Sequence, residues 1–291
     1  YRSALLKKRE FPPAIEGLEA LAEKGAYIFE VAQALEPIYT ARQEHEKLAD
    51  ILLKRVEVTD SRPKRKALLR RVGDIYENRL EDKLQAFKMA RQSLAEDPAD
   101  MGDRMWIEKL ATDANAYEEL ALAYVEETAQ CDESVALQLH RRAADLYFDQ
   151  LEDYGQAAIQ YRDILELRPT DEKSKDGLDQ CYRELEAWAD LVGLLKERLP
   201  KVSGISQRAE LLEEIAELEK TELNNPEEAL KYFLELYNLT PESMAVERKV
   251  DKLYRSLNMW SPLGEFYQRA IEYLERHPHV DDSGRKEGLR F

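Results

Sequence analysis

The sequence Leu223-Asn-Asn-Pro-Glu-Glu-Ala-Leu-Lys-Tyr-Phe-Leu-Glu-Leu-Tyr-Asn-Leu-Thr-Pro241 predicts a helix over residues 226–239. Asn225 stands where a capping residue is expected, and Pro226 suits the first helical turn. Apolar residues recur at helical spacing between these ends, so one face of the helix is expected to be buried. Pro241 disfavours helical backbone in the residue before it, which predicts that the helix ends there.

The same layout occurs twice more, at residues 80–98 and 151–169, at intervals of about 72 residues. Alanine and proline hold fixed positions in the three copies: Ala86, Ala157 and Ala229, and Pro98, Pro169 and Pro241. A weaker copy begins at Phe11. A second series of residues keeps the same interval: His45, Tyr117, Trp188 and Trp260. Because two independent markers share one interval, the sequence indicates an internal repeat.

The rest of the chain also reads as helices joined by short loops. No stretch alternates apolar and polar residues as a half-buried strand would, so we expect an all-α fold of about 15–16 helices. Each repeat then holds four helices, or two helical hairpins. We expect one array over residues 1–291, with copies at roughly 1–60, 61–131, 132–203 and 204–277 and a polar tail at 278–291. A single hairpin cannot bury its apolar face alone, whereas stacked hairpins can.

The spacing of Ala157, Tyr161 and Pro169 resembles the second helix of a tetratricopeptide repeat. The preceding helix also resembles that family, with Ala143-Ala144 and Tyr147 at its preferred positions. The third copy departs from the pattern, since Glu219 stands where tyrosine is expected. The resemblance covers roughly half of the chain well, because the second hairpin of each unit keeps only a loose version of the pattern.

The resemblance implies a right-handed α-solenoid whose first helices line a concave groove that binds an extended peptide or a partner helix. Carrying the family's groove positions onto this chain gives nine candidate partner-binding residues: Arg70, Asp74, Asn78, Arg141, Asp145, Asp149, Glu213, Glu217 and Thr221. The family's two-carboxylate clamp for a peptide C-terminus is not recognisable here.

Charge is the main guide to the partner. The chain of 291 residues has a formal net charge of −16. The basic run at 62–71 attracts phosphates in principle, but a nucleic-acid binder needs a dominant positive surface, so nucleic acid is not expected. The acidic stretch at 210–228 favours a basic protein or peptide partner. The two stretches together also allow head-to-tail self-association, which we do not favour.

We expect no enzyme activity, cofactor or metal. The sequence has no phosphate-binding glycine loop, no GxSxG and no HExxH. The pair His277 and His279 has no third ligand nearby in the sequence, so we interpret it as part of a terminal loop.

We therefore expect a non-catalytic protein-interaction scaffold. The alternative is a regulatory or substrate-recruiting arm of a larger enzyme whose catalytic domain lies outside these residues. The chain starts at Tyr1 inside a repeat, which suggests a piece of a longer protein. There is no apolar run of the roughly 20 residues that a membrane span needs, and no signal peptide. Because the chain is expected to be a piece of a longer protein, the missing signal says little about location, which stays open with the cytoplasm favoured. The acidic, degenerate repeats favour a bacterial source.

Overall fold

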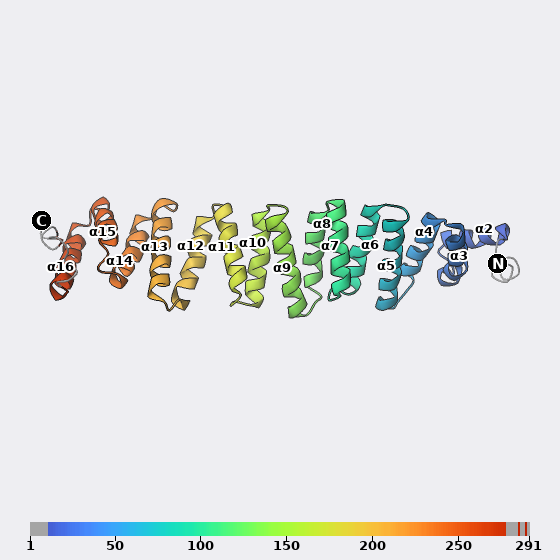
Figure 1. Cartoon of the computed structure of the whole chain (residues 1–291), viewed down its shortest axis with the longest axis horizontal. Helices are drawn as coiled ribbons and strands as arrows, with labels where there is room; N and C mark the ends of the chain where they lie inside the picture. The colour runs from blue at the N-terminus through green and yellow to red at the C-terminus, as the bar shows by residue number, and fades with distance from the viewer. Residues whose placement is uncertain (1–10, 278–284, 286–288, 290–291) are drawn as a thin grey trace. The chain divides into compact units, whose positions relative to one another are not determined.

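The computed structural model describes residues 11–277 together with Arg285 and Leu289. These residues form fifteen α-helices and one short 3-10 helix, with no strand among them (Figure 1). The helices are α2 (Pro12–Glu23), α3 (Ile28–Arg42), α4 (His45–Glu57), α5 (Arg62–Asn78), α6 (Lys83–Glu96), α7 (Met101–Ala114), α8 (Tyr117–Thr128), α9 (Glu133–Asp149), α10 (Tyr154–Leu167), α11 (Glu172–Glu184), α12 (Trp188–Arg198), η1 (Leu199–Lys201), α13 (Ile205–Thr221), α14 (Pro226–Leu239), α15 (Met244–Ser256) and α16 (Trp260–Arg276). The all-α prediction is confirmed.

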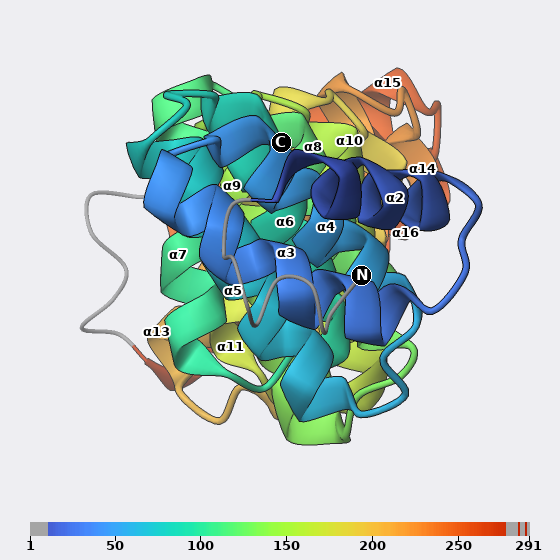
Figure 2. The same cartoon turned by 90° about the vertical axis from the view of Figure 1, so that its right-hand side faces the viewer.

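Consecutive helices pair into antiparallel hairpins (Figure 1). The most extensive pairings are α5 with α6 and α13 with α14, and α9 packs equally closely on α10 within its hairpin and on α8 of the hairpin before it. Contacts between α6 and α7 also join neighbouring hairpins. Figure 2 shows the same helices from the side on which α2 lies. This arrangement of stacked hairpins is the tetratricopeptide-like helical repeat that the sequence resemblance implies.

The described residues divide into two compact units, one ending at Ser174 and the other beginning at Lys175. A core in the first unit is formed where α2–α5 pack together, and Ala32, Leu35 and Leu52 are among its fully buried residues. The core of the second unit is formed by α12–α16, with Phe233 and Phe266 buried at its centre. Each unit is therefore held together by its own apolar interior.

The turns show the repeat interval in the backbone. Residues other than glycine adopt the left-handed backbone conformation with φ between 48° and 57°, and seven of them fall into two series. The first series is Glu81, Glu152 and Asn224, and the second is Gln43, Asn115, Glu186 and Asn258. Within each series they lie about 72 residues apart, which is the interval of the sequence repeat. In addition, His45, Tyr117, Trp188 and Trp260 are the first residues of α4, α8, α12 and α16.

The helix over 226–239 begins and ends as predicted. Asn225 is its N-cap residue, but its side chain does not cap the helix. Instead, the Asn225 amide donates to Glu219, 3.3 Å away, and Lys196 donates to the other oxygen of Glu219 at 2.7 Å. Glu219 is 3% exposed, so these donors compensate a carboxylate buried where the repeat pattern expects tyrosine.

The tail predicted at 278–291 lies outside the described residues, apart from Arg285 and Leu289. Arg285 is buried and forms an ion pair of 2.6 Å with Glu247. Its guanidinium also donates to the backbone oxygens of Pro241 and Glu242. The side chain of Leu289 packs against the core of the second unit.

Candidate partner-binding surface

The nine candidate residues lie on three helices. Arg70, Asp74 and Asn78 are on α5, and Arg141, Asp145 and Asp149 are on α9, both in the first unit. Glu213, Glu217 and Thr221 are on α13, in the second unit. Each helix is the first of a closely packed hairpin.

On α5, Arg70 is engaged within the protein. Its guanidinium forms an ion pair with Asp103 of α7 and lies 5.2 Å from the ring centroid of Trp106. Asp74 and Asn78 are exposed, and Asn78 donates to Asp74 at 2.8 Å. Arg70 therefore fastens α7 to α5, while the other two remain accessible.

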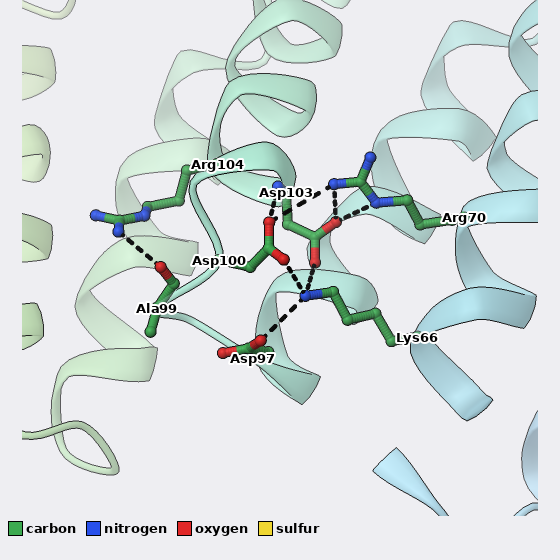
Figure 3. A network of polar contacts seen from close by, with 7 residues as sticks. All are labelled: Lys66, Arg70, Asp97, Ala99, Asp100, Asp103 and Arg104. Atoms are coloured by element: carbon green, nitrogen blue, oxygen red, sulfur yellow. Dashed lines mark hydrogen bonds and ion pairs between the residues drawn. The ribbon is translucent and has the colours of Figure 1, made fainter. Parts of the chain in front are cut away.

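Arg70 belongs to a polar network at the start of α7 (Figure 3). The carboxylate of Asp103 is fully buried, and Lys66 reaches it at 3.0 Å. The Lys66 ammonium also contacts Asp100 at 2.6 Å and Asp97 at 3.1 Å. Burial opposes the charge of Lys66, but the hydrogen bonds to these carboxylates outweigh burial and raise its pKa. The hydrogen bond from Lys66 in turn lowers the pKa of Asp100 to about 2.

The basic run at 62–71 is largely neutralised within the chain. Lys66 and Arg70 enter the network just described, Arg65 pairs with Glu96 at 2.6 Å, and Arg71 pairs with Glu36 of α3. Because these cations are already paired, few charges of the run remain for phosphates. The expectation that the chain does not bind nucleic acid stays a prediction.

On α9, the three candidates differ. Arg141 forms an ion pair of 2.9 Å with Asp171, just before α11. Asp145 and Asp149 are exposed and lie one helical turn apart, and neither carboxylate has a hydrogen bond or ion pair with any described residue. Although Asp145 is exposed, neighbouring atoms partly desolvate its carboxyl group, and this desolvation together with the charge of Asp149 raises its pKa. These two carboxylates are thus the members of the set without an ion pair, although the nearby charges of Arg142, Arg141 and Lys173 act on Asp145.

Asp145 and Asp149 line a surface pocket of about 290 Å³ between α7, α8 and α9. Its other walls are formed by Glu108 and Thr112 of α7, Tyr117, Leu120 and Tyr124 of α8, and Arg142, Leu146 and Gln150 of α9 and its end. The hydroxyl of Tyr124 donates to Glu108 at 2.8 Å, and Arg142 lies 3.6 Å from the same carboxylate. Three carboxylates therefore face one arginine, and Arg142 is closest to Glu108.

On α13, Glu213 and Glu217 are both paired. Lys249 of α15 reaches each of them at 2.7 Å. The Thr221 hydroxyl donates to the backbone oxygen of Glu217 at 3.0 Å. This set ties α15 to α13 in the way that Arg70 ties α7 to α5.

A common feature emerges in the first unit, which we name the ion-pair ladder. It consists of four pairs that join successive first helices, the last through Asp171 just before α11: Glu36–Arg71, Arg70–Asp103, Glu108–Arg142 and Arg141–Asp171. A further pair between α5 and α7, Glu77 with Lys109, has the opposite polarity and is not part of the ladder. The ladder contains two of the predicted binding residues, Arg70 and Arg141. Sequence reasoning missed Glu108, Thr112 and the tyrosines of the pocket, because α7 belongs to a hairpin in which the repeat pattern is loose.

Within the described part of the chain, no helix is long and apolar enough to span a bilayer. Among the same residues, no group of three or more histidine, cysteine or carboxylate side chains is placed to hold a metal ion. His279, one of the two histidines considered above, lies outside them.

Comparison with known proteins shows similarity at the level of structure only. No family model matches the chain, and no curated protein matches it. A structure of Naa15/Naa10 bound to HypK-THB aligns with 88% of this chain and 37% of that chain, at 15% identity and a TM-score of 0.45. This chain therefore spans little more than a third of that protein.

Two further similar structures contain tetratricopeptide repeats. One is a tetratricopeptide repeat protein from Parabacteroides merdae, at 14% identity, with 90% of this chain and 96% of that chain aligned and a TM-score of 0.31. The other is the TPR2AB domain of yeast Sti1 in complex with pHSP90, at 17% identity, with 87% of this chain and 94% of that chain aligned and a TM-score of 0.27. At these identities and TM-scores, the likenesses carry no statement about the function of this chain.

Proposed function

We propose that the chain is a non-catalytic protein-interaction scaffold, and that the pocket between α7, α8 and α9 receives a lysine or arginine side chain of its partner. The observation that carries the proposal is the pair Asp145 and Asp149. Both carboxylates line the pocket, and neither is paired with a described residue. The other charged candidates on α9 and α13, Arg141, Glu213 and Glu217, are occupied by internal ion pairs.

The chemistry of the pocket suits a long cationic side chain. Tyr117, Leu120 and Leu146 offer apolar wall to the methylene groups of lysine or arginine, while the carboxylates accept hydrogen bonds from the charged end. The desolvated surroundings of Asp145 strengthen its interaction with a cation relative to a carboxylate in open water. Binding of this kind weakens with salt, because part of the pocket is open to solvent.

The test uses short random peptides selected by phage display against the intact protein. We expect enrichment of peptides that contain lysine or arginine, with affinities measured by fluorescence anisotropy. The variant Asp145→Asn/Asp149→Asn should weaken binding about tenfold or more, because it removes both negative charges and keeps the size of the two side chains. The matched control is Glu119→Gln/Glu133→Gln, which removes the same charge from exposed positions of α8 and α9 outside the pocket.

Equal affinity of the selected peptides for the Asp145→Asn/Asp149→Asn variant and the control would refute the proposed site. The pH dependence gives an independent check. Since the pKa of Asp145 is raised, its protonation begins at a higher pH than for an ordinary aspartate, and peptide binding should weaken as the pH falls toward that range. The double variant should lose this pH dependence, whereas the control should keep it.

A further inference from the structure

The exposed surface of α7 carries a stripe that leads into the acidic pocket. It consists of Met101, Met105, Glu108 and Thr112, whose spacing of four, three and four residues places them on one face of the helix. Met101 is 61% exposed and Met105 is 67% exposed. Glu108 and Thr112 line the pocket. One half of the stripe is therefore apolar, and the other half belongs to the acidic pocket.

The two methionines form the kind of surface that binds apolar side chains. They lie one turn apart, and both leave more than half of their surface in water. Methionine has an unbranched, polarizable side chain that adapts to the shape of a partner residue. A partner residue that covers this pair would remove apolar surface from water on both molecules.

The neighbouring helix limits what can lie along the stripe. Arg104 of α7 donates to Gln138 of α9 at 2.8 Å, and Glu108 and Arg142 approach to 3.6 Å. These contacts bridge α7 and α9 on both sides of Met105. A helix is about 10 Å across, so a partner helix cannot sit between α7 and α9, and any occupant of the stripe lies over these contacts.

The length of the stripe sets the spacing of the partner's side chains. From the middle of the methionine pair to the middle of the pair Glu108 and Thr112 is seven residues of helix, or about 10.5 Å. An extended polyproline-II chain rises about 3.1 Å per residue with three residues per turn. Two side chains three positions apart therefore point to the same side, about 9 Å apart.

We propose that this surface recognises an extended peptide segment that carries a large apolar residue three positions from a lysine or arginine. The apolar side chain covers Met101 and Met105, and the cation enters the acidic pocket. This inference rests on the proposed function and adds to it the apolar anchor, the conformation and the spacing.

The experiment extends the peptide selection to the variant Met101→Ala/Met105→Ala. Alanine is the best helix former, so this exposed change should leave the fold intact. The matched control is Leu84→Ala/Leu122→Ala, which truncates two exposed leucines on α6 and α8. We expect the methionine variant to bind the selected peptides about tenfold more weakly, and the control to bind them within about twofold of the unaltered protein.

Synthetic versions of the best selected peptide then test the spacing, with the apolar and basic residues set two, three, four or seven positions apart. The spacing of three should bind best. In a helix, residues seven positions apart are separated by about 10.5 Å, the length of the stripe, so a preference for the spacing of seven would overturn the proposal that the peptide is extended. Unchanged affinity for the methionine variant, with affinity lost in the Asp145→Asn/Asp149→Asn variant, would overturn this inference and leave the proposed function standing. Peptides that respond to neither variant, or a selection that enriches no peptide, would overturn both.

Discussion

Gly73 provides the sharpest test of how α7 packs on α5. A Cβ atom at Gly73 would lie 2.4 Å from both Cη2 and Cζ2 of Trp106, and 3.3 Å from Cβ of Met89 on α6. Carbon atoms in contact are normally about 3.5–4.0 Å apart, so the indole would have to retreat by about 1 Å. Its position is fixed by a hydrogen bond of 3.2 Å from Nε1 to Glu77 and by the guanidinium of Arg70. The added methyl group can therefore be accommodated only if Trp106 moves and gives up these contacts.

The expected size of the effect follows from two opposing contributions. Alanine in place of glycine inside a helix stabilises by about 1 kcal/mol. Overpacking of a filled interior costs about 1–3 kcal/mol, and loss of the hydrogen bond from Trp106 to Glu77 costs about 1 kcal/mol. We expect Gly73→Ala to lower the free energy of unfolding by about 1–3 kcal/mol. Gly193 in α12 is the matched control, because a Cβ there meets no atom within 4 Å. Gly193→Ala should stabilise by about 0.5–1 kcal/mol.

Urea unfolding followed by far-ultraviolet circular dichroism measures both effects. The packing argument also predicts that Gly73→Ala becomes neutral or stabilising when Trp106→Leu is already present, because the indole that would clash is then absent. The reasoning fails if Gly73→Ala stabilises as much as Gly193→Ala does. It also fails if the cost of Gly73→Ala persists in the Trp106→Leu background.

Four further outcomes are expected. Asp103→Ala should destabilise by about 2–3 kcal/mol in urea unfolding, because it leaves Lys66 and Arg70 without their buried counter-ion; a cost near zero would contradict this. Asp100→Asn should reduce stability at neutral pH by about 1 kcal/mol. Because the pKa of Asp100 is lowered to about 2, this difference should vanish as the pH falls from about 4 to 2, and a difference that persists in thermal scans at the acidic end would exclude the pairing with Lys66. Glu152→Gly should raise the unfolding free energy by up to about 1 kcal/mol, because Glu152 has a φ of 51°; destabilisation in urea would show that its side chain matters more than its backbone. Cys181 is buried, and burial raises its thiol pKa to about 11, so it should react with iodoacetamide only as fast as the protein unfolds; rapid labelling of the folded protein, read by mass spectrometry, would refute this.

Much of the fold could be predicted because the signals for it are local. The helix over 226–239 is marked at both ends by proline and along its length by apolar spacing, and the structure gives it the same bounds. The backbone conformations of the turns were harder to predict. Glu81 and Glu152 adopt left-handed backbone conformations without glycine, since the hairpin geometry imposes them. Glutamate gives no sign of that conformation, whereas the turn residues Asn115, Asn224 and Asn258 are of a type that favours it.

The candidate surface was harder to predict, because its character depends on residues far apart in the sequence. Arg70 and Arg141 occupy positions that the family uses for binding, but Asp103 and Asp171 neutralise them from 33 and 30 residues away. That pairing exists only once hairpins stack. The pocket combines Asp145 and Asp149, which sequence reasoning singled out, with α7 and α8 residues that it did not.

The ion-pair ladder affects which insertions and deletions of helical hairpins such a chain can tolerate during evolution. Along the first unit, the rungs present negative charge from α3, positive from α5, negative from α7, positive from α9 and negative from Asp171. Deleting a single hairpin, such as α7 and α8, would place the cations of α5 against those of α9. Deleting or duplicating two hairpins together would keep opposite charges in register. An insertion or loss of two hairpins, which is the length of the 72-residue repeat, therefore preserves the charge alternation of the ladder.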